Sequence, residues 1–518
     1  MKQKLLFSLF VLSAATIAWA DVEINETNFP DENFRSFLLE QEYGSDGILT
    51  DTEIAGISSI NVREKFIQSL KGIEYFTALE FLDCAKNQLT SLDVSQNTAL
   101  KILKCWTNQL TALDVSKNPA LKYLDCYDCQ LTAIDVSKNV ELDSLFVDYN
   151  HLTAVDVSKN TALTALWCGE NELTSLDVTK NTALKELDCC DNYLTDLNVS
   201  KNTALEGLLC EGNELTTLDV SHNTALKTLY CLFNQLTVLD VTKNTALNTL
   251  YCGFNQLTAL DISKNTALKE LECYYSQLTA LDVSKHTALK TLYCGFNQLT
   301  ELDVSKNTLL EEFYCPANQL TSIDVSQNTA LIGLACGGNP IKTLDVSKNT
   351  ALKKLECSQN ELTSLDLSKN PALEELDCEA NQLTSLDVSN NPELNFLGIY
   401  QNRINGENMD ALIESMPTLT DGYMYVLYYE DEENVMTAKQ AAAAKAKGWL
   451  PLACTGLDDE GIGIWEEYKG GDGIEEIKNE KFKIQNEGTG WYTLDGRKLR
   501  GKPTQRGLYI HNGKQVLY

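Results

Sequence analysis

The chain has 518 residues, and 42 Lys and Arg against 73 Asp and Glu give it a formal net charge of −31. This charge argues against duplex nucleic acid and anionic membranes as partners, and it favours a basic protein surface or an uncharged glycan. The length suits either several ordinary domains or one long array of repeats.

Residues 1–20 predict export from the cytoplasm. They begin with Lys2 and Lys4, continue with an apolar run from Leu5 to Ile17, and end in Ala18-Trp19-Ala20. This order is typical of a secretory signal peptide that is cleaved before Asp21. The apolar run is shorter than the ~20 residues of a membrane-spanning helix. We therefore expect a soluble, extracytoplasmic protein that does not insert into a membrane.

Residues 21–78 are predicted to form an N-terminal cap. The segment FPDENFRSFLLEQEYGSDGILTDTEI predicts a short amphipathic helix, a loop and a second short helix. The loop resembles a degenerate EF-hand, since Gly47 and Glu53 fit the pattern. However, Glu42 and Gly44 stand at the first and third ligand positions, so one ligand is missing. We expect a helical cap without calcium, and no metal or other cofactor elsewhere.

Residues 79–405 are built from about sixteen copies of a 21-residue repeat, which reads L-x-x-L-x-C-x-x-N-x-L-x-x-L-D-V-S-x-N-x-x. Cysteines recur at this step from Cys84 to Cys378, with Val147 in the cysteine slot once and Ile399 after the last copy. A fixed period of this kind predicts a solenoid, in which each repeat buries its apolar face only against its neighbours.

Each repeat is predicted to contain one short strand. In the copy from Leu289 to Asn307, apolar and polar residues alternate, so Leu292 and Cys294 are expected to point inward and Tyr293 outward. The Asn of the following turn, such as Asn297, is expected to satisfy backbone groups there.

The cysteine slot also accepts Val147 and Ile399, so it is expected to hold a small buried hydrophobe. In-register strands ~4.8 Å apart place the thiols in a parallel column, where the torsion of a disulfide is hard to reach. We predict reduced thiols, despite the oxidising compartment that export implies. Cys190, on the outward strand face, is predicted to be a reactive surface thiol.

The repeats resemble bacterial leucine-rich repeats, and most closely the cysteine-ladder group of the internalin family, over roughly residues 57–405. The resemblance implies a curved solenoid with a parallel sheet on its concave face and protein binding through that face. The expected fold is therefore an α/β repeat protein dominated by short parallel strands, with a helical N-terminal cap and an α/β C-terminal cap.

Three further segments follow the repeats. Residues 406–455 predict an α/β cap: a helix, a strand from Tyr423 to Tyr429, and a helix that stops at Gly448. Residues 456–487 are rich in Gly, Asp and Glu and predict a flexible linker. Residues 488–518 contain three strand-like runs with Asp495-Gly496 and Asn512-Gly513 turns. This tail resembles the sorting domains of Gram-negative type IX secretion, although it can also be a small β appendage without a sorting role.

The sequence contains no catalytic constellation. Its four histidines occupy unrelated places, and neither a glycine-rich phosphate loop nor a serine elbow is present. The column of acids that includes Asp240, Asp261 and Asp303 is predicted to accept backbone N–H groups in turns rather than to bind metal. We therefore expect a protein that is not an enzyme.

The outward positions near each cysteine vary while the frame stays constant, and this is where repeat proteins usually carry recognition. Many of these positions are aromatic, and the period aligns them into two neighbouring columns. The candidate ligand-binding residues are Tyr230, Phe233, Tyr251, Phe254, Glu272, Tyr274, Tyr275, Tyr293, Phe296 and Tyr314, with a looser group of Trp106, Tyr127, Tyr149 and Trp167.

A contiguous exposed aromatic patch is typical of a contact site, and Tyr and Trp are typical interface anchors. We predict a secreted or cell-surface binding protein, an adhesin or interaction module, whose favoured partner is a protein on another cell or surface. Two alternatives stay open. The same aromatic residues could bind a glycan, or they could only pack along the sheet of a purely structural surface protein.

Overall fold

The computed structural model describes residues 21–458 and 462–471, together with four short C-terminal strands. The predicted signal peptide, residues 1–20, lies outside the described residues. The chain divides into two compact units, Met1–Ala165 and Leu166–Tyr518. None of the helices in the described part has the length and apolar character that crossing a bilayer requires.

The first unit opens with a helical cap, as predicted. β1 (Val22–Glu23) pairs antiparallel with β2 (Ile48–Leu49), and between and after them lie α1 (Glu32–Glu40), η1 (Glu42–Gly44) and α2 (Asp51–Gly56). Asp31 caps α1, because its Oδ1 accepts from the Phe34 backbone N–H at 3.0 Å. Thr50 and Glu53 form a capping box at the start of α2.

The capping box uses the acid that an EF-hand would turn toward calcium. Glu53 Oε2 accepts from both the backbone N–H and the hydroxyl of Thr50, each at 2.8 Å. Gly47 has a φ of 84°, which suits the glycine turn of that loop. In the part of the chain that the structure describes, no group of three or more His, Cys, Asp or Glu is arranged to hold a metal ion.

The rest of the first unit is a parallel sheet with one strand per repeat. Each strand pairs in parallel with the next, and from β4 onward the register partners are one 21-residue period apart. The elements are β3 (Ser59–Asn61), η2 (Ile73–Tyr75), β4 (Phe81–Asp83), β5 (Ile102–Lys104), β6 (Tyr123–Asp125) and β7 (Ser144–Phe146). The next strand, β8 (Ala165–Trp167), spans the boundary between the units.

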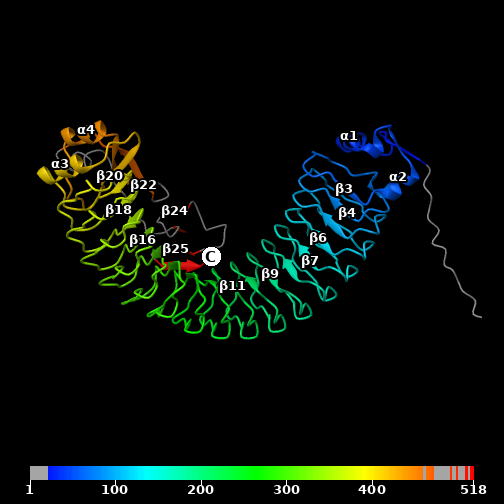
Figure 1. The fold of residues 1–518 in the computed structure, drawn as a ribbon, viewed down its shortest axis with the longest axis horizontal. Coiled ribbons are helices and arrows are strands. Elements are labelled where there is room, and N and C mark those ends of the chain that lie inside the picture. The colour runs from blue at the N-terminus through cyan, green and yellow to red at the C-terminus, as the bar shows by residue number, and fades with distance from the viewer. Residues whose placement is uncertain are drawn as a thin grey trace, which may run out of the picture. The chain divides into compact units, whose positions relative to one another are not determined.

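The second unit continues the pattern, with its turns along an arc and its strands on the inner side (Figure 1). The repeat strands are β9 (Glu186–Asp188), β10 (Gly207–Leu209), β11 (Thr228–Tyr230), β12 (Thr249–Tyr251), β13 (Glu270–Glu272), β14 (Thr291–Tyr293), β15 (Glu312–Tyr314), β16 (Gly333–Ala335), β17 (Lys354–Glu356), β18 (Glu375–Asp377) and β19 (Phe396–Gly398). Neighbouring strands from β9 to β19 are parallel and in register, which confirms the predicted fold class.

Two columns of buried asparagines close each turn. Asn297 Nδ2 donates to the carbonyls of Cys273 at 2.9 Å and Gly295 at 3.1 Å, and its Oδ1 accepts from Leu278 N–H at 3.0 Å. This arrangement confirms the predicted role of the Asn slot. In the second column, Asn307 Nδ2 donates to the Val283 carbonyl at 2.9 Å. Both columns tie one repeat to the previous one through hydrogen bonds to buried backbone groups, such as the Cys273 and Val283 carbonyls.

The inward positions form the core that the repeat pattern predicts, with Leu292 and Cys294 fully buried. All seventeen cysteines carry free thiols. Burial raises the pKa of the ladder thiols, to about 12 for Cys273, so they are packing groups rather than nucleophiles. Cys190 is half-buried, and burial together with nearby Asp188 raises its thiol pKa as well. The prediction of a reactive thiol at Cys190 is therefore wrong.

The second unit ends in the predicted α/β cap. It consists of α3 (Gly406–Ser415), β20 (Gly422–Leu427), α4 (Ala438–Ala446), β21 (Trp449–Leu457) and β22 (Gly463–Glu467). β20 and β21 extend the parallel sheet, and β22 pairs antiparallel with β21. β22 lies within residues 456–487, so the predicted linker is partly wrong. Its strand residues Ile464 and Trp465 are held by pairing with Gly456 and Cys454.

The C-terminal region contributes four strands, where the sequence pattern predicts three. β23 (Trp491–Tyr492), β24 (Lys498–Leu499), β25 (Leu508–His511) and β26 (Lys514–Leu517) form an antiparallel sheet in the order β24-β23-β25-β26. The predicted Asp495-Gly496 and Asn512-Gly513 turns, and most of the predicted linker after Gly471, lie outside the described residues.

Candidate binding face

The candidate residues of the second unit stand on the strand face, which is the outward side of the parallel strands. Five of them are the last residues of consecutive strands and are in-register partners. This strand column consists of Tyr230, Tyr251, Glu272, Tyr293 and Tyr314. Its neighbours at the two ends are Leu209 of β10 and Ala335 of β16.

The rings of the strand column stack in two pairs. Tyr230 and Tyr251 lie 4.4 Å apart between ring centroids with 9° between their planes, and Tyr293 and Tyr314 lie 4.6 Å apart with 2°. Glu272 separates the pairs. The Tyr251 hydroxyl donates to Glu270 Oε2 at 2.7 Å, which fixes the direction of that ring.

The second column lies in the turn three residues further on and forms one continuous stack. This turn column consists of Phe233, Phe254, Tyr275 and Phe296, whose successive centroids are 4.1, 4.5 and 4.0 Å apart. The interplanar angles are 16°, 13° and 11°. Tyr274 packs against Phe254 edge to face at 5.0 Å. Two neighbouring columns are what the period predicts, whereas the tightness of the stack follows from the structure.

All four residues of the turn column have left-handed backbone conformations, with φ between 49° and 54°. Glycine is the residue best suited to such a φ, and Gly212 and Gly338 hold the same slot in other repeats. A bulky side chain there costs about 1 kcal/mol, and each stacked pair returns about 1 kcal/mol. The stacking energy is thus similar in size to the backbone strain, and partial burial of the rings adds to the stability of the sheet.

Stacking determines which part of each ring can meet a ligand. Because the two inner rings stack on neighbours at both faces, their edges are the parts that a ligand can meet. Phe296, at one end, is 38% exposed. A sugar binds an aromatic residue through the ring face, whereas a protein side chain can pack against a row of edges. The geometry of the turn column thus suits protein contacts better than glycan contacts.

The strand face is acidic and partly shielded from water. Burial and neighbouring Glu270 raise the pKa of Glu272, and burial raises the pKa of Glu211 to about 7. Burial and Glu272 also raise the pKa of the Tyr274 hydroxyl to about 12, so it stays protonated at neutral pH. A basic partner would relieve the poor solvation of these carboxylates.

The looser aromatic group does not form a comparable column. In the first unit, the Trp106 ring is covered by the Arg63 guanidinium, 4.6 Å from the centroid, and by Lys86 Nζ at 5.4 Å. Tyr127 and Tyr149 meet at 5.1 Å with a steep interplanar angle of 65°. Trp167 is 45% exposed and belongs to β8. These residues occupy different slots of the repeat, whereas the turn column keeps one slot over four repeats, so the turn column is the stronger candidate.

Sequence reasoning missed a second aromatic cluster at the C-terminal end of the second unit. Tyr425 and Trp465 meet at 4.6 Å, and Tyr400 lies 5.3 Å from both Tyr428 and Trp465. Tyr425, Tyr428 and Trp465 lie beyond the 21-residue repeats, whereas Tyr400 follows Ile399 in the slot that Tyr274 holds after Cys273. Trp465 is brought in by β22, in the range where the sequence predicts a linker. Tyr400, two residues beyond the alternating strand pattern, was the one available signal.

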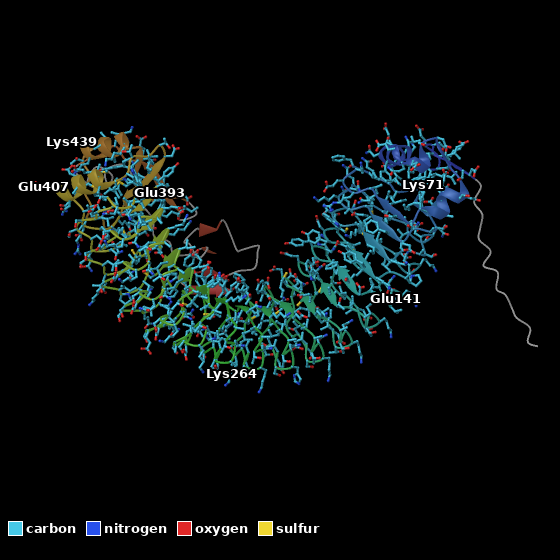
Figure 2. The ribbon with its side chains drawn as sticks, viewed as in Figure 1. Lys71, Glu141, Lys264, Glu393, Glu407 and Lys439 are labelled. Carbon is cyan, nitrogen blue, oxygen red and sulfur yellow. The ribbon has the colours of Figure 1, made fainter. Side chains whose placement is uncertain are left out.

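The column of aspartates lies in the return segments of the repeats and has the structural role predicted for it. Asp261 Oδ1 accepts from the Ser263 backbone N–H at 2.9 Å, and these hydrogen bonds lower the pKa of Asp261. Lys264, in the same segment, lies on the outer side of the arc (Figure 2). The aspartates are therefore turn formers, away from the strand face.

Comparison with known proteins identifies the chain as a leucine-rich repeat protein. The Zer-1-like leucine-rich repeat family matches residues 206–347. The structure is also similar to a leucine-rich repeat protein of Leptospira interrogans, with a TM-score of 0.60 and 24% identity, over 67% of this chain and 96% of that one. A plant peptide hormone receptor, RGFR1 in complex with RGF2, shares the fold at a TM-score of 0.58 and 18% identity, over 74% of this chain and 76% of that one.

The particular family follows from a nearer relative. The functional domain of InlJ from Listeria monocytogenes, which includes a cysteine ladder, is 35% identical and has a TM-score of 0.63, over 75% of this chain and 83% of that one. The chain belongs to the internalin-like leucine-rich repeat family with a cysteine ladder. Whole Internalin J of the same species is 39% identical over 70 residues, which are 13% of this chain and only 8% of that protein.

Proposed function

We propose that the chain is a secreted or cell-surface, non-enzymatic binding protein that holds a protein partner on the strand face of its second unit. The observation that carries this proposal is the continuous stack of Phe233, Phe254, Tyr275 and Phe296. Its ring edges lie at the surface of the strand face, where a partner can contact them. Four consecutive aromatic residues at a slot that mostly holds polar or small residues in other repeats support a role in recognition.

Three observations favour a protein over a glycan. The ring faces of the turn column are covered, so edges are what a ligand meets. The net charge of −31 and the half-buried carboxylates beside the rings suit a basic surface. A plant receptor of the same fold is described in complex with RGF2. The glycan alternative and the purely structural alternative become outcomes of the test.

The route to the surface is part of the proposal. The pattern of residues 1–20 supports export, and the C-terminal region with β23 to β26 supports recognition by a type IX secretion system as a sorting domain. With such a tail the strand face would be displayed outside the cell, where an adhesin or interaction module meets its partner.

The first experiment asks which kind of ligand the protein binds. The labelled mature protein is applied to a panel of candidate cell surfaces before and after protease treatment, and separately after periodate oxidation of glycans. We expect protease to abolish binding and periodate to leave it intact, and we expect added salt to weaken it. Loss after periodate alone would support the glycan alternative, and no binding across the panel would support the structural one.

The second experiment tests the site with the double variant Phe254→Gly/Tyr275→Gly. Glycine removes two rings and also relieves the left-handed strain, so the fold should be retained. We expect binding to fall by about tenfold or more, as for interface anchors, while the melting temperature changes little. Gln359→Gly is the matched control, because Gln359 has a φ of 49° in the same slot of another repeat. Equal binding by the double variant and the control would refute the site.

A further inference from the structure

The turn that contains β16 differs from its neighbours in the size of its outward residues. They are Gly333, Ala335, Gly337 and Gly338. The adjacent strands carry large side chains at the register partners of β16, Glu312 and Tyr314 on one side and Lys354 and Glu356 on the other. A depression of about 290 Å³ lies over this turn. Its lining includes Tyr314, Ala335, Lys354, Glu356, Asp377 and Phe396.

One wall of the depression is the end of an aromatic stack. Tyr314 packs one face on Tyr293, with 2° between the planes. Its register partner on the other side is Ala335, so the strand column stops there. Among the described residues Tyr293 is the one aromatic ring in contact with Tyr314. The Tyr314 ring therefore borders the depression on the side that a further ring would occupy, one strand spacing of ~4.8 Å away.

The opposite wall is acidic. Glu356 and Asp377 follow Ala335 in register on β17 and β18. Burial, with the neighbouring carboxylates, raises the pKa of Asp377 to about 6 and that of Glu379, just beyond it, to about 8. Lys354 is the one cation among the described lining residues, and it is paired with Glu375 at 2.8 Å between Nζ and Oε1. The wall therefore lacks a positive partner of its own.

The volume, the aromatic wall and the acidic wall of the depression favour a planar cation about as large as an amino-acid side chain. The volume lies just below that of typical small-molecule sites, which begin near about 300 Å³. A guanidinium is planar, so it stacks flat on an aromatic ring and forms bidentate hydrogen bonds with carboxylates. An ammonium can lie over a ring, but it is a compact charge without this planar, bidentate geometry. The gap left by Ala335 places the ring and the carboxylates on either side of such a group.

We propose that this depression is an arginine subsite: an arginine of the bound protein takes the place of the missing ring, between Tyr314 and Glu356. The biological role of the subsite rests on the proposed protein-binding function, since the arginine would come from the partner. The subsite itself can be tested without any partner.

The test measures saturation-transfer NMR of N-acetyl-arginine amide with the full mature protein. The neutral isostere N-acetyl-citrulline amide and N-acetyl-lysine amide serve as comparison probes. We expect transfer to the arginine side chain that is about fivefold stronger than transfer to citrulline or lysine and that decreases with salt. Equal transfer to the citrulline probe would overturn the proposal, and stronger transfer to lysine would overturn the assignment to arginine.

Two variants locate the signal. Ala335→Tyr fills the depression with a residue that the same slot holds in Tyr293 and Tyr314, so the fold should accept it. Glu356→Gln/Asp377→Asn removes the charge but keeps the oxygens that accept from the Ser358 and Glu379 N–H groups. We expect each change to reduce transfer to the arginine probe by about fivefold or more.

Glu301→Gln/Glu393→Gln is the matched control, since it removes the same charge from two exposed side chains. Transfer that survives in Ala335→Tyr, or falls equally in the control, would overturn the subsite. Because these measurements use no partner, their failure leaves the proposed function standing. Conversely, Phe254→Gly/Tyr275→Gly should abolish partner binding while transfer to the arginine probe persists.

Discussion

At the scale of single residues, the strand face combines side chains that stability alone would not select. Phe254 and Tyr275 occupy left-handed positions that glycine fills in other repeats. Glu379 lies beside Asp377 and Tyr400, in a half-buried place where its charge is poorly solvated. Such residues support the proposed role of this face in binding.

The Asp377–Glu379 pair predicts an unusual pH dependence. Burial and mutual repulsion raise both pKa values above the ordinary carboxyl range, to about 6 and about 8. A raised folded-state pKa gives stability that is present below the unfolded pKa and is lost as the pH rises through the folded one. We expect the melting temperature of the native protein, relative to Glu379→Gln, to fall between about pH 5 and about pH 8. A difference that stays constant across this range would contradict the assignment.

At the scale of the repeat, the buried asparagines fix the backbone of each turn, and this backbone positions the aromatic columns. Asn108 donates to the Cys84 and Cys105 carbonyls at 3.1 and 2.8 Å and accepts from Leu89 N–H at 3.0 Å. In the next repeat Cys129 takes this slot and offers one thiol, 3.2 Å from the Cys105 carbonyl. Cys126 and Cys129 therefore belong to two columns of the repeat, and their spacing does not mark a redox motif.

Restoring the repeat at this slot should stabilise the protein. Cys129→Asn supplies a two-proton donor and an acceptor where the thiol is a weak donor, so we expect a gain of about 1–2 kcal/mol in the free energy of unfolding. Equilibrium denaturation in urea measures it. Cys129→Ala, which removes the thiol and leaves the Cys105 carbonyl with Asn108 as its side-chain donor, should lower the stability. A loss of stability in Cys129→Asn would show that the slot is too tight for the larger amide.

At the scale of the whole molecule, each turn is buried only between its neighbours, so the core is a column that runs the length of each unit. The ladder thiols are part of this column and are fully buried. Parallel side chains one strand spacing apart do not reach the torsion of a disulfide. The structure accordingly carries seventeen free thiols, although the proposed location is outside the cytoplasm.

A thiol titration tests this property directly. The mature protein is purified without reductant and treated with an aromatic disulfide reagent, first folded and then in denaturant. We expect little reaction in the folded state, because burial raises the pKa of the ladder thiols, and seventeen equivalents after unfolding. Two equivalents fewer, or any larger even deficit, would reveal disulfides. Fast reaction of the folded protein would show that some turns open locally.

Much of the fold and part of the candidate site follow from the sequence, because an exact period leaves little freedom. Once Leu292 and Cys294 point inward, Tyr293 must point outward, and a repeat of 21 residues places Tyr293 beside Tyr314. The same logic assigned the asparagine slot and the turn aspartates. Beyond the last repeat the period no longer predicts which segments pair. β22 pairs antiparallel with β21, and the sequence pattern of residues 456–487 did not predict this pairing.

The sequence by itself determined which residues are buried, which are exposed and which lie side by side on adjacent strands. The alternation of apolar and polar residues and the 21-residue period are enough for this, because these properties depend on the geometry of the repeating chain alone. The tertiary structure decided which ring faces are covered, and it placed Trp465 beside Tyr400 and Tyr425. It also showed that a depression lined by Tyr314, Ala335 and Glu356 remains at the β16 turn, although Glu312 and Glu356 reach over Gly333 and Gly337. Side-chain orientation and the burial of charge depend on packing across strands, and no single repeat contains that information.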